Sequence, residues 1–212
     1  MNTAYISTAY LGPIQLYTKL LAYDQICLET QENYLKQTYR NRCIIAAANG
    51  PQALTVPIVK PDTLKCLTKD IRISDHGNWR HLHWNALVSA YRMSPFFEYY
   101  EEDFAPFYEK KYEFLLDFNE ALREVVCQLI DIQPQIHYTT DYQADVTADF
   151  REIIRPQTRK KRSLIPACSL LPGIPGKTGF PSESQYRRFT FQHGAGKPSC
   201  STKIHTKRYL NI

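Results

Sequence analysis

The chain has 212 residues and a mass of 24.7 kDa, which gives room for one domain of ordinary size, or for one domain with a tail. Its composition, 43% hydrophobic, 22% charged and 13% aromatic, excludes a wholly disordered chain. No apolar run is long enough to span a membrane, and the first residues lack the basic start of a secretory signal. Six scattered cysteines without a CxxC pair favour buried thiols over a disulfide framework or a zinc site. We therefore expect a cytoplasmic protein without a membrane span.

Charge is divided sharply along the chain. Residues 1–154 carry 14 basic and 20 acidic side chains, whereas residues 155–212 carry 12 basic and one acidic, so the net charge of +5 is −6 and +11 in the two parts. The second part also contains the basic run at residues 159–162 and many Pro and Gly residues, and it has almost no hydrophobic periodicity. We expect a domain over residues 4–156, followed by an irregular, basic and disordered tail over residues 157–212.

Within the first part, the sequence predicts short strands alternating with helices. Pro13 suits the first position of a helix, and residues 25–29 resemble a short strand. Residues 43–48 and 53–58 flank Asn49-Gly50, a pair that tolerates the positive φ angles of a tight turn, and they predict a β-hairpin. Residues further on, at 70–74, alternate apolar and polar side chains as a half-buried strand does.

The clearest predicted helix follows Asn78, which suits an N-cap, and ends before Ser94-Pro95. Its apolar side chains recur at helical spacing on one face: Trp79, Leu82, His83, Ala86, Leu87, Ala90 and Tyr91. Pro106 is expected to begin the next helix, and Asp117 with Glu120 has the spacing of a capping box for another. Together these elements predict an α+β fold, a single mixed domain of short strands and helices.

Three blocks of the sequence then become informative about function. In order, they are AYLGPIQLYTKL, YRNRCIIAAANGPQALTVPI and HGNWRHLHWNALVSAYRMSPFF, and they resemble the WbqC-like protein family of bacteria over residues 4–156. The resemblance implies a role in the biosynthesis of O-antigen and other surface polysaccharides, as a transferase that adds an acyl or aminoacyl group to a sugar. The implied partner is a sugar or an activated acyl donor. The alternative is a non-catalytic binding protein of the same pathway.

Two side chains are candidates for catalysis. His83 lies on the apolar stripe and would serve as a general base near neutral pH, or else as a core histidine bonded to a backbone carbonyl. Cys43 would be a nucleophile if the neighbouring guanidinium of Arg42 lowered its pKa, or else a small buried hydrophobe in a strand. The sequence contains no Gly-rich phosphate loop, GxSxG elbow or HExxH motif, which argues against an ATPase, a serine hydrolase or a metalloprotease.

The candidates for substrate binding are Asn41, Arg42, Trp79 and Tyr91. The planar fork of Arg42 suits a carboxylate or phosphate, although a structural ion pair is an equal alternative. Trp79 and Tyr91 would stack on a sugar, or pack in the core. We expect Asn41, Arg42 and His83 to border one cleft.

A metal site is the weakest of the candidate sites. His76, His81 and His83 lie near Asp75 in the sequence and supply ligand types that metals favour. On a helix, however, His81 and His83 point about 200° apart and would not converge on one ion. We therefore expect neither a metal nor a cofactor.

The basic tail raises nucleic-acid binding as a third class of function. The genetic code offers another explanation. The resemblance implies a C-terminus similar to PYYQVFxxKxGFLPNLSIxDLLFNMGPE. Codons exist for residues 168–177 and 177–197 that, read one base later, encode VPYYQVFQEK and KQGFLPNLSIVDLLFNMGPE. We therefore expect a frameshift between residues 155 and 162, no nucleic-acid partner, and loss of an apolar helix whose absence would inactivate the chain if that helix lines the site.

Overall fold

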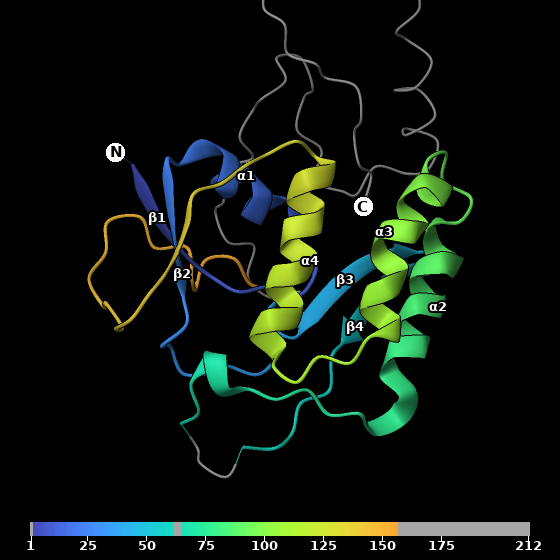
Figure 1. The fold of residues 1–212 in the computed structure, drawn as a ribbon, viewed down its shortest axis with the longest axis horizontal. Coiled ribbons are helices and arrows are strands. Elements are labelled where there is room, and N and C mark those ends of the chain that lie inside the picture. The colour runs from blue at the N-terminus through green and yellow to red at the C-terminus, as the bar shows by residue number, and fades with distance from the viewer. Residues whose placement is uncertain (1, 62–64, 157–212) are drawn as a thin grey trace, which may run out of the picture. The chain divides into compact units, whose positions relative to one another are not determined.

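The computed structural model describes residues 2–61 and 65–156, and these form a mixed α+β fold as predicted (Figure 1). The predicted tail at 157–212, including the proposed frameshifted part, lies outside the described residues. The elements in chain order are β1 (Thr3–Ser7), α1 (Ile14–Ala22), β2 (Gln25–Glu29), β3 (Arg42–Ala47), β4 (Gly50–Thr55), α2 (Trp79–Tyr91), α3 (Phe97–Glu109), α4 (Leu115–Leu129) and β5 (Ile136–Tyr138). None of the helices in these ranges is both long and apolar enough to cross a bilayer.

A small parallel sheet forms one side of the fold. β1 pairs with β2 in register from Thr3↔Gln25 to Ser7↔Glu29, and β2 pairs with β5. Because α1 connects β1 to β2, these elements form a βαβ unit. On the other edge of β1, the N–H of Tyr5 donates to the Ala148 carbonyl at 2.9 Å. The carboxyl ends of β1 and β2 therefore meet at the same edge of the sheet.

The predicted hairpin is confirmed, with a shift in its turn. β3 and β4 pair antiparallel from Arg42↔Thr55 to Ala47↔Gly50. The residue with positive φ is Gly50, at +109°, which is the first residue of β4. Glycine is needed there because a side chain would be strained in that conformation.

Helix α4 lies between the parallel sheet and the group formed by the hairpin, α2 and α3 (Figure 1). Its fully buried Phe118 and Leu122 belong to the core cluster shared with the hairpin and α2, whereas Cys127 belongs to the cluster beneath the sheet. One amphipathic helix thus joins two hydrophobic clusters.

One predicted helix boundary is confirmed and another is wrong. Asn78 is the N-cap residue of α2 as predicted, although its φ is 47° and its side chain makes no capping hydrogen bond. Pro106 lies inside α3, because burial of Phe107 and Tyr108 outweighs the one backbone hydrogen bond that proline cannot donate.

The start of α4 and the buried face of α2 also differ from the prediction. α4 begins at Leu115, which is fully buried, so Asp117 lies in the first turn instead of capping it. Leu82 is 60% exposed, and the buried residues of α2 are Trp79, His83 and Leu87 at spacing i, i+4 and i+8. The buried stripe of α2 is therefore narrower than periodicity suggested.

Residues 70–74 do not form a strand of a regular sheet. Ile71 and Ile73 are buried as the alternation predicted, but this segment pairs only through isolated bridges, Ile58↔Ile73 and Arg72↔Phe114. The alternation of apolar and polar residues indicates which side chains are buried, but it does not show that a neighbouring strand is present.

Candidate functional site

His83 is enclosed in the core between α2 and the hairpin. It is 6% exposed, its Nδ1 lies 2.9 Å from the Tyr10 hydroxyl, and its other polar partner is the backbone carbonyl of Thr55. The direction of the hydrogen bond between Nδ1 and the Tyr10 hydroxyl depends on the tautomer of the ring. Burial lowers the pKa of His83 to about 4. His83 is therefore neutral near pH 7 and enclosed in the core.

Cys43 lies in the same cluster, on β3. Its side chain is 1% exposed, and burial raises the pKa of its thiol to about 12, although a hydrogen bond with Tyr10 acts in the opposite direction. At neutral pH the thiol is protonated and out of contact with solvent. This environment is typical of an inert core cysteine, since nucleophilic thiols are exposed and have lowered pKa values.

Asn41 and Arg42 contact the end of β4, where His83 also has a partner. The Asn41 amide donates to the Val56 carbonyl at 3.1 Å, and Arg42 Nε donates to the Thr55 hydroxyl at 3.1 Å. Asn41, Arg42 and His83 thus each contact Thr55 or the residue after it. These contacts are all with protein groups, and a cleft bordered by the three residues stays a prediction.

Trp79 and Tyr91 stand at opposite ends of α2. Trp79 is 4% exposed and its ring packs edge-on against Phe118, with centroids 5.6 Å apart. Tyr91 is half-buried, and its hydroxyl accepts the Ala46 N–H at 3.1 Å. These contacts suit packing of the helix on the core and the hairpin.

The histidines considered as metal ligands lie in different surroundings. His81 is exposed and bonds to Asn85 at 2.9 Å, whereas His83 is enclosed as described above. Among residues 2–61 and 65–156, no group of three or more His, Cys, Asp or Glu side chains could hold a metal ion.

A different cluster of charged groups lies at the carboxyl edge of the parallel sheet. Arg40 is 2% exposed and donates two hydrogen bonds to Glu32, from Nε to Oε1 at 2.7 Å and from Nη2 to Oε2 at 2.6 Å. The same Nη2 donates to the hydroxyl of Ser7, the last residue of β1, at 2.8 Å. Ser7 in turn donates to Glu32 at 3.0 Å.

A second buried ion pair lies beside the first. Glu29, the last residue of β2, is fully buried and accepts from Arg151 Nη1 at 3.0 Å and from the Thr139 hydroxyl at 2.6 Å. Arg151 also donates two hydrogen bonds to Asp149, from Nε to Oδ1 at 2.9 Å and from Nη2 to Oδ2 at 2.7 Å. The pKa of the Asp149 carboxyl is lowered, chiefly by its hydrogen bonds with Arg151. We call Ser7, Glu29, Glu32, Arg40, Asp149 and Arg151 the edge network.

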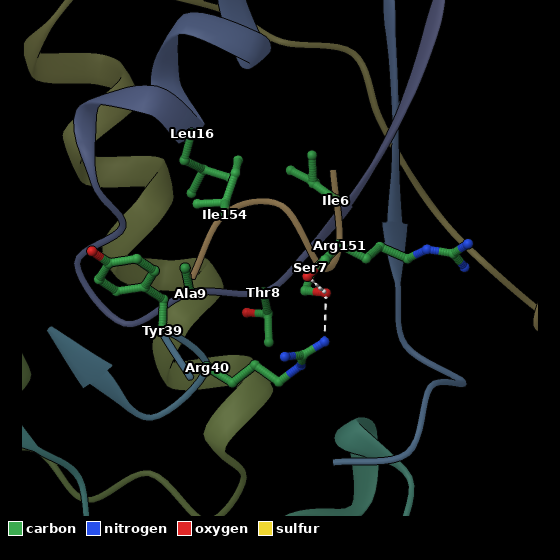
Figure 2. Close-up of a pocket in the computed structure, with 9 residues that line it drawn as sticks. All are labelled: Ile6, Ser7, Thr8, Ala9, Leu16, Tyr39, Arg40, Arg151 and Ile154. Carbon is green, nitrogen blue, oxygen red and sulfur yellow. Dashed lines mark hydrogen bonds between the residues drawn. The ribbon is translucent and has the colours of Figure 1, made fainter. Parts of the chain in front are cut away.

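A small pocket opens between the edge network and α1. Figure 2 shows the Arg40 guanidinium directed toward Ser7, while the Arg151 side chain extends away and Leu16 and Ile154 form an apolar wall. The cavity volume is about 10 Å³, which is room for about one water molecule. The edge network is therefore tightly closed in this conformation.

The loop that leaves β1 is strained. Leu11 has φ of 41°, in the left-handed region that branched, bulky side chains rarely adopt. This loop joins the carboxyl end of β1 to α1, next to the edge network. Backbone strain at such a position is typical of ligand-binding loops.

Sequence reasoning missed the edge network. The only local signals were the position of Arg40 directly before Asn41-Arg42 and a carboxylate at the end of the predicted strand at 25–29. Nothing in the sequence indicated Arg151, whose partner Glu29 is 122 positions away.

Comparison with known proteins identifies the family. The profile described as "WbqC-like protein family" matches residues 8–164, which is more than half of the chain. The chain belongs to the WbqC-like protein family. It is also similar to "Uncharacterized protein Rv1507c" of Mycobacterium tuberculosis (strain ATCC 25618 / H37Rv), with 27% identity over 144 residues. That alignment covers 67% of this chain and 62% of the relative, so it spans less than two thirds of the relative's length. No solved structure matches.

Proposed function

We propose that this WbqC-like protein binds a sugar or an activated acyl donor at the carboxyl edge of its parallel sheet. We place this step in the cytoplasm, in the biosynthesis of O-antigen or another surface polysaccharide, as an acyl or aminoacyl transfer to a sugar. The observation that carries the proposal is the edge network, in which the buried charges of Glu29, Glu32, Arg40 and Arg151 gather where β1 and β2 end.

Topology supports this location. In open sheets of parallel strands, ligands bind in the crevice outside the carboxyl ends of the strands. β1, α1 and β2 form such a unit, and Ser7 and Glu29 are the last residues of the two strands. The strained Leu11 lies in the loop that follows β1.

Energetics supports the same conclusion. Removing a charge from water is costly, and a buried ion pair is often no more stabilising than apolar side chains of the same volume. Two such pairs, Arg40–Glu32 and Arg151–Glu29, are therefore poorly explained by stability alone. Both arginines are already paired with carboxylates, so we assign them to positioning Ser7 and the surrounding loops. The substrate would be bound by groups around the edge network.

The second candidate is a non-catalytic binding protein of the same pathway. One observation favours it: His83 and Cys43, the expected base and nucleophile, are both uncharged and enclosed. Their contacts stabilise the fold without presenting a reactive group to a ligand.

A turnover assay distinguishes the candidates. The purified full chain is incubated with nucleotide-linked amino sugars and acetyl coenzyme A, and acylated sugar is measured by mass spectrometry. Glu29→Gln removes one of the two charge partners of Arg151 and should lower turnover about a hundredfold, as expected for misplaced reacting groups. The control is Glu113→Gln, which breaks an exposed pair with Arg72 and should change nothing.

The outcomes separate cleanly if circular dichroism shows both variants folded. Product that depends on Glu29 supports the transferase. Saturable binding of the sugar donor without product supports the binding protein. If neither product nor binding is detected, the proposed function is refuted.

A further inference from the structure

We propose that a second pocket, on the polar face of the parallel sheet, binds a single monosaccharide ring, with an amino sugar preferred over a neutral one. Its volume is about 200 Å³, and it lies between β1 and β2 on one side and the segment after β5 on the other. The residues that carry the argument are Tyr5, Cys27, Thr139, Thr140, Asp141 and Gln143. The choice of a sugar over other polyhydroxylated compounds rests on the proposed function.

This face of the sheet differs from the opposite face. Ile6, Ile26 and Leu28 point to the side covered by α1 and α4, where they are buried. Tyr5 and Cys27 are paired in register and, because side chains alternate along a strand, point to the other side. Both are only half-buried there, and Cys27 has a free thiol.

The size of the pocket limits the ligand. Sites for drug-sized molecules have volumes of about 300–1,000 Å³, so a whole nucleotide or a lipid is too large. The pocket is nevertheless much larger than the water-sized cavity beside Arg40. A group with the size of one ring is the best match.

The chemistry of the wall favours hydroxyl and amine groups. Gln143 accepts the Tyr5 hydroxyl at 2.8 Å through Oε1, which leaves its amide N–H groups available to donate. Asp141 accepts from Thr140 at 3.3 Å through Oδ2 and offers its other oxygen as an acceptor. A ring that carries several hydroxyls both donates and accepts, and the aromatic ring of Tyr5 offers an apolar surface to its C–H groups.

Charge selects among sugars. The lining includes one carboxylate, Asp141, and no Lys or Arg. The Arg151 guanidinium lies over the Tyr5 ring, 5.8 Å from its centroid, and over the Tyr142 ring at 4.8 Å, and it is paired with both Asp149 and Glu29. An ammonium group would therefore be attracted and a phosphate repelled. An amino sugar is also a chemically suitable acceptor for an acyl group.

The pocket is connected to the edge network through Thr139. This residue lines the pocket, and its hydroxyl donates to the buried Glu29 at 2.6 Å. A sugar bound here would lie next to the edge at which we place the donor. The two sites would then be parts of one reaction centre.

Cys27 provides a direct measurement, because a ligand in the pocket covers its thiol. The full chain is treated with iodoacetamide at neutral pH, and alkylation of Cys27 and Cys66 is followed by peptide mass spectrometry. Both thiols are free and half-buried, and Cys66 is not part of the pocket wall. The probes are glucosamine, glucose and glucose 6-phosphate, at about 10 mM each.

Glucosamine should slow alkylation of Cys27 about tenfold, the factor 1 + [L]/Kd for a dissociation constant near 1 mM, and should leave Cys66 unchanged. Glucose should protect about threefold less, as expected for the loss of one exposed charge pair, and glucose 6-phosphate should not protect. Asp141→Asn should remove the preference for glucosamine. Asp145→Asn, which changes an exposed acid of the same segment outside the pocket wall, should retain it.

Four results would overturn the inference. Two are no alkylation of Cys27 in the free protein and no protection of Cys27 by either glucose or glucosamine. The others are protection of Cys66 equal to that of Cys27, and protection of Cys27 by glucose 6-phosphate equal to that by glucosamine. The assay requires no turnover. Acylated product without protection therefore refutes this pocket and leaves the proposed function intact, whereas protection without product retains the pocket and favours the binding protein.

Discussion

Acidification should destabilise the folded protein through His83. Its ordinary pKa of 6.5 falls to about 4 in the fold because burial disfavours the charged ring. Between these values the unfolded chain binds a proton that the folded chain does not, so stability rises with pH through this window. The contribution of the neutral ring is complete above pH 6.5 and is lost progressively below it. The full difference is about 3 kcal/mol, and about 2 kcal/mol is lost by pH 5.

Urea unfolding measured by tryptophan fluorescence tests this expectation. Both tryptophans, Trp79 and Trp84, lie on α2, and the ring of Trp79 contacts His83 with centroids 5.1 Å apart. The free energy of unfolding is measured from pH 7.5 to 4.5 for the natural chain and for His83→Gln. The glutamine amide can both donate and accept hydrogen bonds, as the neutral ring can, but it does not titrate.

The quantity of interest is the difference between the two proteins as a function of pH, because carboxylates contribute equally to both. It should change by about 2 kcal/mol between pH 7.5 and 5. The other described histidines, His76, His81 and His137, are exposed and are present in both proteins. A difference that stays constant over this range would refute the reasoning. If the variant does not fold, an NMR titration of the His83 ring in the natural chain should show no protonation above pH 5.

Three further predictions concern the core and the tail. Arg40→Met leaves Glu32 buried without its charge partner and should lower the free energy of unfolding in urea by about 3–5 kcal/mol. Arg72→Met, at an exposed pair, should lower it by less than about 1 kcal/mol. Equal losses in the two variants would contradict the burial of the edge network. Cys43 should remain unmodified by iodoacetamide at pH 7.5 under native conditions, since its thiol is enclosed and has a raised pKa; rapid labelling would show that the core opens. If residues after about 156 are translated out of frame, the coding DNA read one base later encodes a segment similar to LPNLSIVDLLFNMGPE, and a different reading there would refute the frameshift.

The parts of the fold that follow from local physics were predictable. Residues 25–29 and the α2 helix have the apolar spacing of a strand and a helix, and both formed with nearly the expected bounds. Exact starts were not predictable, because they depend on distant partners. Leu115 begins α4 where its N–H donates to the Ile71 carbonyl at 2.9 Å, a contact that no local pattern specifies.

For the candidate site, periodicity gave the position of His83 but not its chemistry. A histidine on an apolar stripe fits both a general base and a core residue, and the two differ only in what surrounds the ring. Tyr10 supplies one hydrogen bond from the loop after β1, and the Thr55 carbonyl supplies the other from the end of β4. Because these partners lie 73 and 28 positions from His83 by residue number, the sequence could not distinguish the two roles.

The edge network shows the same dependence on distant partners, with a consequence for function. A carboxylate at the end of a short strand, such as Glu29, is ordinarily exposed, and only the later return of residues 139 and 151 to this edge buries and pairs it. Arg40 is held at the same edge, since Asn119 of α4 donates to its backbone carbonyl at 2.7 Å. The charges are therefore brought together by segments from distant parts of the chain, and several are fixed by groups outside the sheet. A site built in this way is sensitive to changes far from any ligand, so variants of α4 or of residues 139–151 should alter binding at the edge even where they touch no substrate.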